Sequence, residues 1–195
     1  MKKGNLKKLT VCAVLIALAT ALSFVTIWEM PFGGSVTLLS MLPIVLIPIL
    51  YGTGWGMVSA FLYSVIQLAC SLGKLMSWGL TPSVFIGAVL LDYLVAFSLL
   101  GLAGLFRNKG FFGVMGGVSL VLVLRFTSHF LSGVILWANF EEFVAFGHSW
   151  VNHPALYSLC YNGMFMLPEL ALTLIGAAVL YKTGTVDRLR KETAQ

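Results

Sequence analysis

Long apolar segments alternate with short polar connections along the whole chain. About 20 apolar residues are needed to cross the hydrocarbon core of a bilayer. The pattern predicts six membrane-crossing helices, at 9–27, 38–51, 54–73, 83–106, 112–137 and 155–181. The first apolar run is long and lacks a small-residue cleavage motif, so it is interpreted as a retained helix and not as a signal peptide. The expected fold is therefore an all-α integral membrane protein with six transmembrane helices.

The composition agrees with this pattern. Of the 195 residues, 59% are hydrophobic and 10% are charged, and the mean hydropathy is +0.96. These values are typical of an integral membrane protein. A separate soluble domain is not expected, so residues 1–195 are interpreted as a single membrane domain.

The net charge of +5 comes from basic residues at the ends of the apolar segments. An excess of Lys and Arg marks the cytoplasmic side of a membrane protein. In a six-helix chain one side collects Lys2, Lys3, Lys7, Lys8, Arg107, Lys109, Lys182, Arg188, Arg190 and Lys191. Both termini are therefore expected in the cytoplasm, with a bacterial plasma membrane as the location. This distribution explains the basic charge without a nucleic-acid partner.

Two connections combine aromatic and polar residues. The segment "WEMPFGGSVTLLS" (28–40) precedes a short apolar run broken by Pro43 and Pro48, which suits a re-entrant or capping loop. The segment "ANFEEFVAFGHSWVNHP" (138–154) is expected to pack at the outer interface. Both loops fall on the same face, where they could close a pocket.

A stripe of four residues in the apolar segment "LRFTSHFLSGVILW" (124–137) indicates a cavity wall. Arg125, His129, Gly133 and Trp137 recur every four residues, so on a helix they share one face. His129 and Trp137 would lie roughly 12 Å apart along the axis, with the glycine leaving space for something flat. Taken singly, His129 could be a core histidine and Trp137 an interfacial residue.

Asp92 lies near the middle of the fourth apolar segment. A carboxylate at that depth costs about 2.5–3.5 kcal/mol on insertion scales, so it must face something polar. One interpretation is a buried ion pair with Arg125 that fixes helix packing. The other is a counter-charge for a cationic ligand.

The last apolar segment carries further polar groups. Tyr157, Tyr161 and Asn162 are expected near its outer end, where Asn162 offers the donors and the acceptor that a heteroaromatic ring edge requires. Interhelical hydrogen bonding is the alternative for Asn162. Glu169 follows Pro168 inside the same segment, and no function is assigned to it.

Small residues recur every four positions near the start of the chain, at Ala13, Ala17 and Ala21. Such a stripe permits close approach of another helix. The partner could belong to this chain or to another protein.

Several kinds of chemistry find little support. The chain lacks the G-x-x-x-x-G-K-[ST] phosphate loop, so ATP-driven work by that route requires a partner. Ser132 and His129 lack a G-x-S-x-G elbow and a third member, which makes nucleophilic catalysis a weak hypothesis. His148 and His153 with Glu141 or Glu142 match no strong metal motif. An enzyme, a resident metal and a cofactor are therefore not expected.

Four segments together resemble a known family in their order and spacing: "MPFGGSVTLLSMLPI", "LLDYLVAF", "LRFTSHFLSGVILW" and "LYSLCYNGMFMLP". They are similar to the thiamine-specific S component of energy-coupling factor (ECF) transporters, over nearly the whole chain. The resemblance implies a six-helix subunit with the S-component fold that captures thiamine from outside with high affinity. It would dock on one transmembrane coupling protein and two ABC ATPases, and would have no catalytic activity alone.

The resemblance also implies roles for individual residues in binding thiamine. Asp92 would face the cationic ring, His129 and Trp137 would flank a ring, and Tyr157 and Asn162 would bind polar edges. The ligand chemistry agrees, because a thiazolium cation calls for a carboxylate and aromatic faces.

Three further assignments come from the same resemblance. Trp28 would stack on the ligand from above, and Tyr93 would reach the hydroxyethyl tail. The partner interface would be formed by Ala13, Ala17 and Ala21. The chain departs from the family in its longer 138–154 connection and in having Asp92 where other members have Glu, so the distance from this carboxylate to the ligand could differ.

Three alternatives remain open at this stage. The first is a proton-coupled carrier that uses Asp92, Arg125 and Glu169 as a relay. The second is an S component for a different cationic vitamin or precursor. The third is an intramembrane enzyme built around Ser132 and His129.

Overall fold

The structure is a computed structural model that describes residues 3–30, 33–137, 144–145, 148–149 and 153–194. Within these residues, five helical stretches are long and apolar enough to cross a membrane: Gly4–Ser23, Thr53–Ser77, Pro82–Gly104, Gly110–Trp137 and Pro154–Lys182. A shorter apolar helix, α2 (Met41–Tyr51), completes the set. The fold is an all-α membrane bundle of six helices, as the hydropathy pattern predicts.

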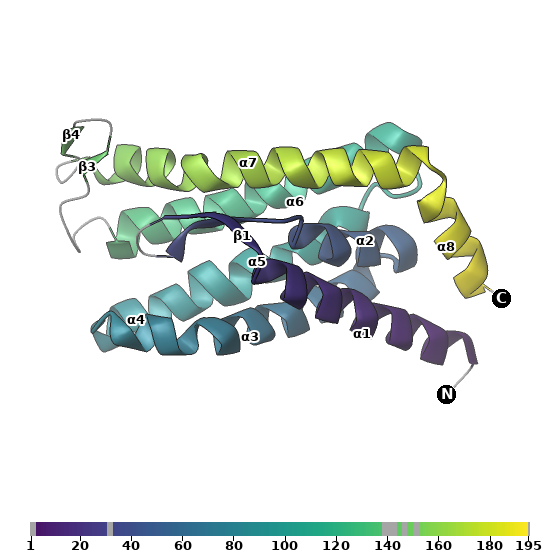
Figure 1. The fold of residues 1–195 in the computed structure, drawn as a ribbon, viewed down its shortest axis with the longest axis horizontal. Coiled ribbons are helices and arrows are strands. Elements are labelled where there is room, and N and C mark those ends of the chain that lie inside the picture. The colour runs from purple at the N-terminus through teal and green to yellow at the C-terminus, as the bar shows by residue number, and fades with distance from the viewer. Residues whose placement is uncertain (1–2, 31–32, 138–143, 146–147, 150–152, 195) are drawn as a thin grey trace.

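The helices lie along the long axis of the molecule, and both termini lie at the same end (Figure 1). The bundle contains α1 (Lys3–Ser23), α3 (Thr53–Ser77), α6 (Gly110–Ser132) and α7 (Pro154–Lys182). The remaining long stretch, Pro82–Gly104, changes geometry along its length, through α4 (Pro82–Ala88), η2 (Val89–Val95), α5 (Ala96–Ser98) and η3 (Leu99–Gly104). A π-helical segment, η4 (Gly133–Trp137), continues α6.

The second apolar segment, 38–51, forms only a short helix, and a strand hairpin precedes it. Strands β1 (Thr26–Glu29) and β2 (Ser35–Thr37) pair antiparallel, with Trp28 opposite Val36. With 11 residues, α2 is about 16 Å long at 1.5 Å per residue, roughly half the hydrocarbon thickness. The predicted first helix therefore extends too far, because the chain leaves α1 at Ser23 and enters the hairpin.

Helix α2 lies at the centre of the main hydrophobic core, and nearly all its side chains are buried, Ile44 and Ile47 completely. Glycines allow its neighbours to approach closely. A Cβ at Gly56 would meet the Gly101 carbonyl and Pro48, and one at Gly104 would meet the Pro48 carbonyl. Small residues thus pack α2, α3 and η3 backbone to backbone, the usual arrangement where helices associate in a membrane.

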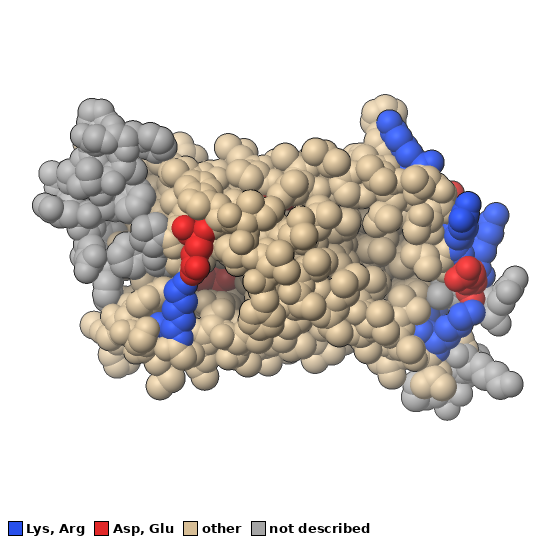
Figure 2. Space-filling model, in the orientation of Figure 1, with Lys and Arg blue, Asp and Glu red and all other residues tan. Residues whose placement is uncertain are grey.

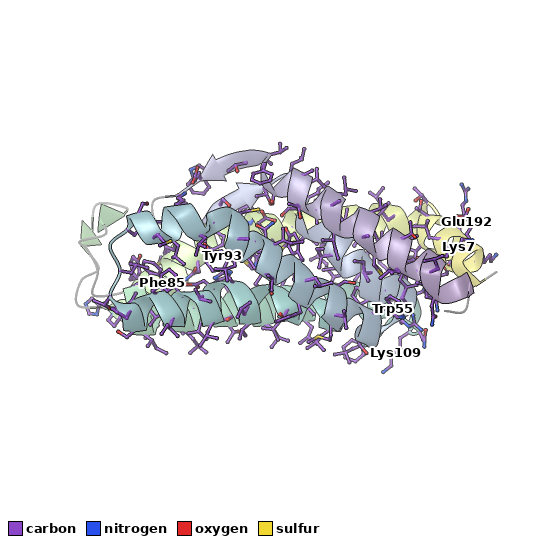
Figure 3. The ribbon with its side chains drawn as sticks, turned by 90° about the horizontal axis from the view of Figure 1, so that it is seen from below. Lys7, Trp55, Phe85, Tyr93, Lys109 and Glu192 are labelled. Carbon is purple, nitrogen blue, oxygen red and sulfur yellow. The ribbon has the colours of Figure 1, made fainter. Side chains whose placement is uncertain are left out.

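The charged residues gather at the ends of the molecule. Figure 2 shows Lys and Arg side chains concentrated at the end that carries both termini, with an uncharged middle on this face. Lys7 and Lys109 lie at this end, and Lys7 donates a hydrogen bond to the Glu192 carbonyl (Figure 3). The uncharged middle and its exposed apolar side chains form the surface expected of a multi-pass membrane protein.

A helix that the hydropathy pattern does not predict, α8 (Thr185–Ala194), closes the terminal end of the bundle. Its Arg190 donates to the Ile49 carbonyl at 2.8 Å, and Arg107 donates to the Leu50 carbonyl at 2.8 Å. Both acceptors are terminal carbonyls of α2, which lack partners within their own helix. These two basic residues therefore cap a buried helix, a role beyond the topology signal predicted from charge.

Two very short strands, β3 (Val144–Ala145) and β4 (His148–Ser149), pair antiparallel at the opposite end. The rest of the connection 138–152 lies outside the described residues, so the predicted packing of this loop at the outer interface stays a prediction.

Candidate functional site

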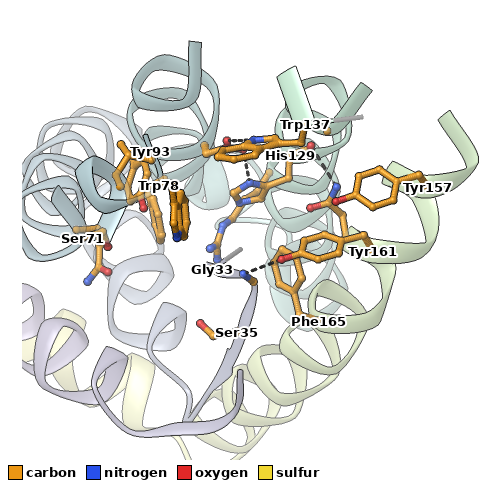
Figure 4. A pocket seen from close by; sticks show the side chains of 18 residues that line it. Gly33, Ser35, Ser71, Trp78, Tyr93, His129, Trp137, Tyr157, Tyr161 and Phe165 are labelled. Carbon is orange, nitrogen blue, oxygen red and sulfur yellow. Dashed lines mark hydrogen bonds and ion pairs between the residues drawn. The ribbon is translucent and has the colours of Figure 1, made fainter. Parts of the chain in front are cut away.

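A cavity opens among α3, η2, α6, η4, α7 and the β1–β2 hairpin. Its volume is about 160 Å³, an order of magnitude more than the roughly 10–15 Å³ that one water molecule requires. Its walls are formed by Gly33, Gly34, Ser35, Gln67, Ser71, Leu75, Trp78, Asp92, Tyr93, Phe97, Arg125, His129, Gly133, Trp137, Tyr157, Tyr161, Asn162 and Phe165 (Figure 4). The lining is rich in aromatic rings and contains one carboxylate.

The Asp92 carboxylate accepts hydrogen bonds on both oxygens. Its Oδ1 lies 3.0 Å from His129 Nδ1. Its Oδ2 accepts from Ser132 Oγ at 2.6 Å and from Trp137 Nε1 at 3.0 Å. Three side chains of the α6–η4 helix thus fix the orientation of a carboxylate carried by the neighbouring helix.

Two of the four residues in this network lie in π-helical segments. Asp92 belongs to η2, and Trp137 ends η4. Single π-helical turns inside α-helices occur often at functional sites, because the extra residue in the turn redirects the side chains that follow. The α-helical spacing correctly places His129 and Trp137 on one face. It does not predict the change from α-helical to π-helical geometry at η2 and η4.

Gly133 has a different role from the one its spacing suggests. A Cβ at this position would meet the Ser158 hydroxyl and would lie 3.2 Å from Asn162 Nδ2. The absence of a side chain therefore lets α7 approach α6. The glycine borders the cavity, but the space beside it is occupied by α7.

Arg125 does not pair with Asp92, in contrast to the packing interpretation of the carboxylate. Its guanidinium carbon lies 4.2 Å from the centre of the Phe97 ring, and its Nη1 contacts Met41 Sδ at 2.5 Å. Among the described residues, the basic side chain within ion-pair distance of the Asp92 carboxylate is His129.

Aromatic rings form two facing walls of the cavity. Trp78 and Tyr93 lie on one side, Tyr157 and Tyr161 on the other, and Trp137 between them (Figure 4). Trp78 and Trp137 meet edge to face, with centroids 5.5 Å apart. Tyr157 and Tyr161 are stacked at 5.7 Å. Such walls suit a flat ligand, and their faces attract a cation.

Asn162 joins α7 to α6. Its amide nitrogen lies 3.2 Å from the His129 carbonyl and 3.0 Å from the Ser158 hydroxyl. The contact with the His129 carbonyl joins the two helices and supports the alternative of interhelical hydrogen bonding, whereas the contact with Ser158 lies within α7. The residue also borders the cavity, so the two roles are compatible.

The structure brings six of the seven predicted binding residues to one cavity: Asp92, Tyr93, His129, Trp137, Tyr157 and Asn162. Trp28 does not line it, because this side chain stands on β1 and is 44% exposed. Another indole, Trp78, lines the cavity instead. Sequence reasoning missed Trp78 because the third predicted span ends at 73, whereas α3 continues to Ser77.

The small-residue stripe lies on the surface. Ala13, Ala17 and Ala21 are all exposed on α1, while Cys12, Ile16 and Ala19 on the other face are buried. The stripe therefore packs against no helix within the described part of this chain.

The structure gives a metal site no support within the described residues, where no group of three His, Cys, Asp or Glu side chains could hold an ion. The Glu141 and Glu142 carboxylates considered for such a site lie outside the described residues.

Comparison with known proteins gives concordant results. A family model described as "Thiamine transporter protein (Thia_YuaJ)" matches residues 9–187. The curated thiamine transporter ThiT of Bacillus subtilis (strain 168) is 30% identical, over 92% of this chain and 93% of that protein. A solved structure of ThiT from Listeria monocytogenes has a TM-score of 0.74 at 24% identity, covering 95% of this chain and 98% of that one; this likeness supports the fold. The chain therefore belongs to the thiamine transporter protein (Thia_YuaJ) family of multi-pass membrane proteins.

Proposed function

We propose that this chain is a thiamine-capture subunit, which binds thiamine in the cavity beside Asp92 and passes it on through an ATP-driven coupling module. The observation that carries the proposal is the Asp92 carboxylate, oriented by three hydrogen bonds at an aromatic cavity, in a chain of the thiamine transporter family. The B. subtilis relative is named a thiamine transporter.

The cavity chemistry suits the two rings of thiamine. The permanent charge of the thiazolium ring requires a counter-charge when it leaves water, and Asp92 supplies one. Aromatic faces such as those of Trp137 and Trp78 add cation–π attraction of about 2 kcal/mol when desolvated. The aminopyrimidine edge needs donors and acceptors, which Asn162 and Tyr157 offer.

Capture and energy supply are assigned to different proteins. The chain lacks a phosphate-binding loop, so the proposed partners are one ECF transmembrane coupling protein and two ABC ATPases. The exposed Ala13, Ala17 and Ala21 stripe fits docking on a helix of the coupling protein, since small residues permit close helix approach. The basic end that carries both termini would face the cytoplasm.

Binding is tested by titrating the detergent-purified chain with thiamine, using calorimetry and tryptophan fluorescence. Saturable one-to-one binding is expected, with quenching because Trp78 and Trp137 line the cavity. Riboflavin, a vitamin without a permanent cation, is the control in the calorimetric titration and is expected to give no heat of binding.

The division of labour is tested in proteoliposomes. Thiamine accumulation is expected only when the coupling protein, both ATPases and ATP are present. Accumulation by the chain alone against a gradient, abolished by a protonophore, would instead support a proton-coupled carrier.

A further inference from the structure

We propose that Glu169 is a positioning residue for the binding cavity: it anchors the base of the β1–β2 hairpin, which forms one wall of the cavity, without touching the ligand itself. This inference rests on the proposed function for the identity of the ligand. The anchoring contact itself does not depend on which ligand binds.

The hairpin contributes cavity wall through its second half. Gly33, Gly34 and Ser35 line the cavity, and the Gly34 amide donates to the Tyr161 hydroxyl at 3.2 Å (Figure 4). Met30 and Val36 are buried in a small apolar cluster with aromatic residues of α7. Whatever fixes the hairpin against α7 therefore also fixes this wall.

Glu169 makes the anchoring contact at the point where the hairpin ends. Its Oε1 accepts from the Thr37 amide at 2.5 Å and from the Thr37 hydroxyl at 2.7 Å. The same hydroxyl lies 2.6 Å from Ser40 Oγ, just before α2 begins. One carboxylate thus holds the last residue of β2 and, through it, the turn into α2.

The turn itself requires such an anchor. Leu39 has φ +60° and is the one non-glycine residue with positive φ in the described part of the chain. This conformation is disfavoured for a side chain with a Cβ and persists where surrounding contacts impose it. The bonds from Thr37 to Glu169 and Ser40 supply that constraint directly beside it.

The burial of Glu169 indicates that its contact with Thr37 is a specific interaction and not an incidental one. Glu169 is 1% exposed within a membrane-spanning helix, where a carboxylate is costly and is retained only for a specific interaction. It does not line the cavity. Spacing of four along α7 aligns it with Tyr161 and Phe165, which do. One stripe of α7 thus serves both the cavity and the hairpin.

Three variants separate anchoring from other roles. Glu169→Ala removes both hydrogen bonds. Glu169→Gln keeps an acceptor oxygen for both Thr37 donors and removes the charge. Thr37→Val removes the hydroxyl bond and leaves the amide bond, and it carries the test if Glu169→Ala does not fold. Asp92→Asn serves as a control outside the hairpin.

The first readout is hydrogen exchange of peptides spanning 33–40 without ligand. Glu169→Ala is expected to accelerate exchange there about tenfold or more, because the hairpin opens locally. Thr37→Val should show a smaller effect in the same direction, Glu169→Gln should stay close to wild type, and Asp92→Asn should match wild type. Wild-type exchange in Glu169→Ala, or a Gln variant as fast as the Ala variant, would overturn the proposal.

The second readout is thiamine binding kinetics by stopped-flow fluorescence. A loosened wall shortens residence, so Glu169→Ala should raise the dissociation rate about tenfold or more while changing association less than about threefold. Faster hydrogen exchange with an unchanged dissociation rate would also overturn the proposal. If wild type binds no thiamine, the proposed function fails, and ligand-free exchange still decides whether Glu169 anchors the hairpin.

Discussion

Replacing Asp92 with asparagine isolates the charge of the carboxylate from its hydrogen bonds. An asparagine oxygen can accept from Ser132 and Trp137, while its amide donates to the Nδ1 of a neutral His129 in its other tautomer. The network therefore survives the substitution, and thermal stability should change little. What is lost is the negative charge at the cavity.

The magnitude follows from the position of the carboxylate. Unit charges about 4 Å apart at an effective dielectric constant of about 20 interact by about 4 kcal/mol, and disrupting a buried charge pair at an interface commonly costs 2–5 kcal/mol. Since Asp92 is partly buried beside the cavity, we expect a loss of about 2–4 kcal/mol. This loss corresponds to a roughly 30- to 1,000-fold rise in Kd for thiamine.

The assay is isothermal titration calorimetry of wild type and Asp92→Asn with two ligands. The first ligand is thiamine, which carries the thiazolium charge. The second is its aminopyrimidine fragment, which lacks that charge. The substitution should weaken the binding of thiamine strongly, whereas the Kd of the fragment should rise by less than about threefold. Equal losses for both ligands, or a thiamine Kd within about threefold of wild type, would refute the assignment of Asp92 as the counter-charge.

Three further changes test neighbouring parts of the account. Trp137→Phe keeps an aromatic ring but removes the N–H donated to Asp92, so titration should show thiamine binding weaker by about 1–2 kcal/mol. Gly133→Ala should separate α6 from α7, lowering stability by about 1–3 kcal/mol in thermal unfolding, whereas Gly163→Ala, where a Cβ meets nothing within 4 Å, should be neutral. Ala17→Trp should leave thiamine binding intact and abolish ATP-driven uptake in proteoliposomes, because Ala17 is exposed on α1; normal uptake would remove the stripe from the coupling interface.

Hydropathy predicts the bundle well because membrane-crossing helices need long apolar runs, and such runs can be recognised directly in the sequence. It places the end of the first helix at 27 and not at Ser23, because the residues that lead into the hairpin are apolar as well, and Val25 and Ile27 are read as helix. It also misses α8, whose sequence is polar and whose docking depends on Arg190 reaching α2. Local composition does not indicate that a residue distant in the sequence will cap a helix end.

Site residues that lie on one helix could be predicted from the sequence. Contacts between side chains of different helices could be predicted less well. The spacing of His129 and Trp137 predicts that they share one helix face. Asp92 was identified because a carboxylate is unusual in an apolar segment. Trp78 enters the cavity through the longer course of α3, and the partners of Asp92 depend on two π-helical turns. The pairing of Glu169 with Thr37 spans 132 residues, so no local pattern indicates it.

The central claim is that thiamine binds in the cavity with its cationic ring beside Asp92. Determining the structure of the thiamine complex tests it most directly. The account predicts thiamine between the aromatic walls, with the thiazolium within ion-pair reach of the Asp92 carboxylate and the pyrimidine edge toward Asn162. Thiamine bound elsewhere on the protein, or in this cavity with its charge turned away from Asp92, would contradict the account.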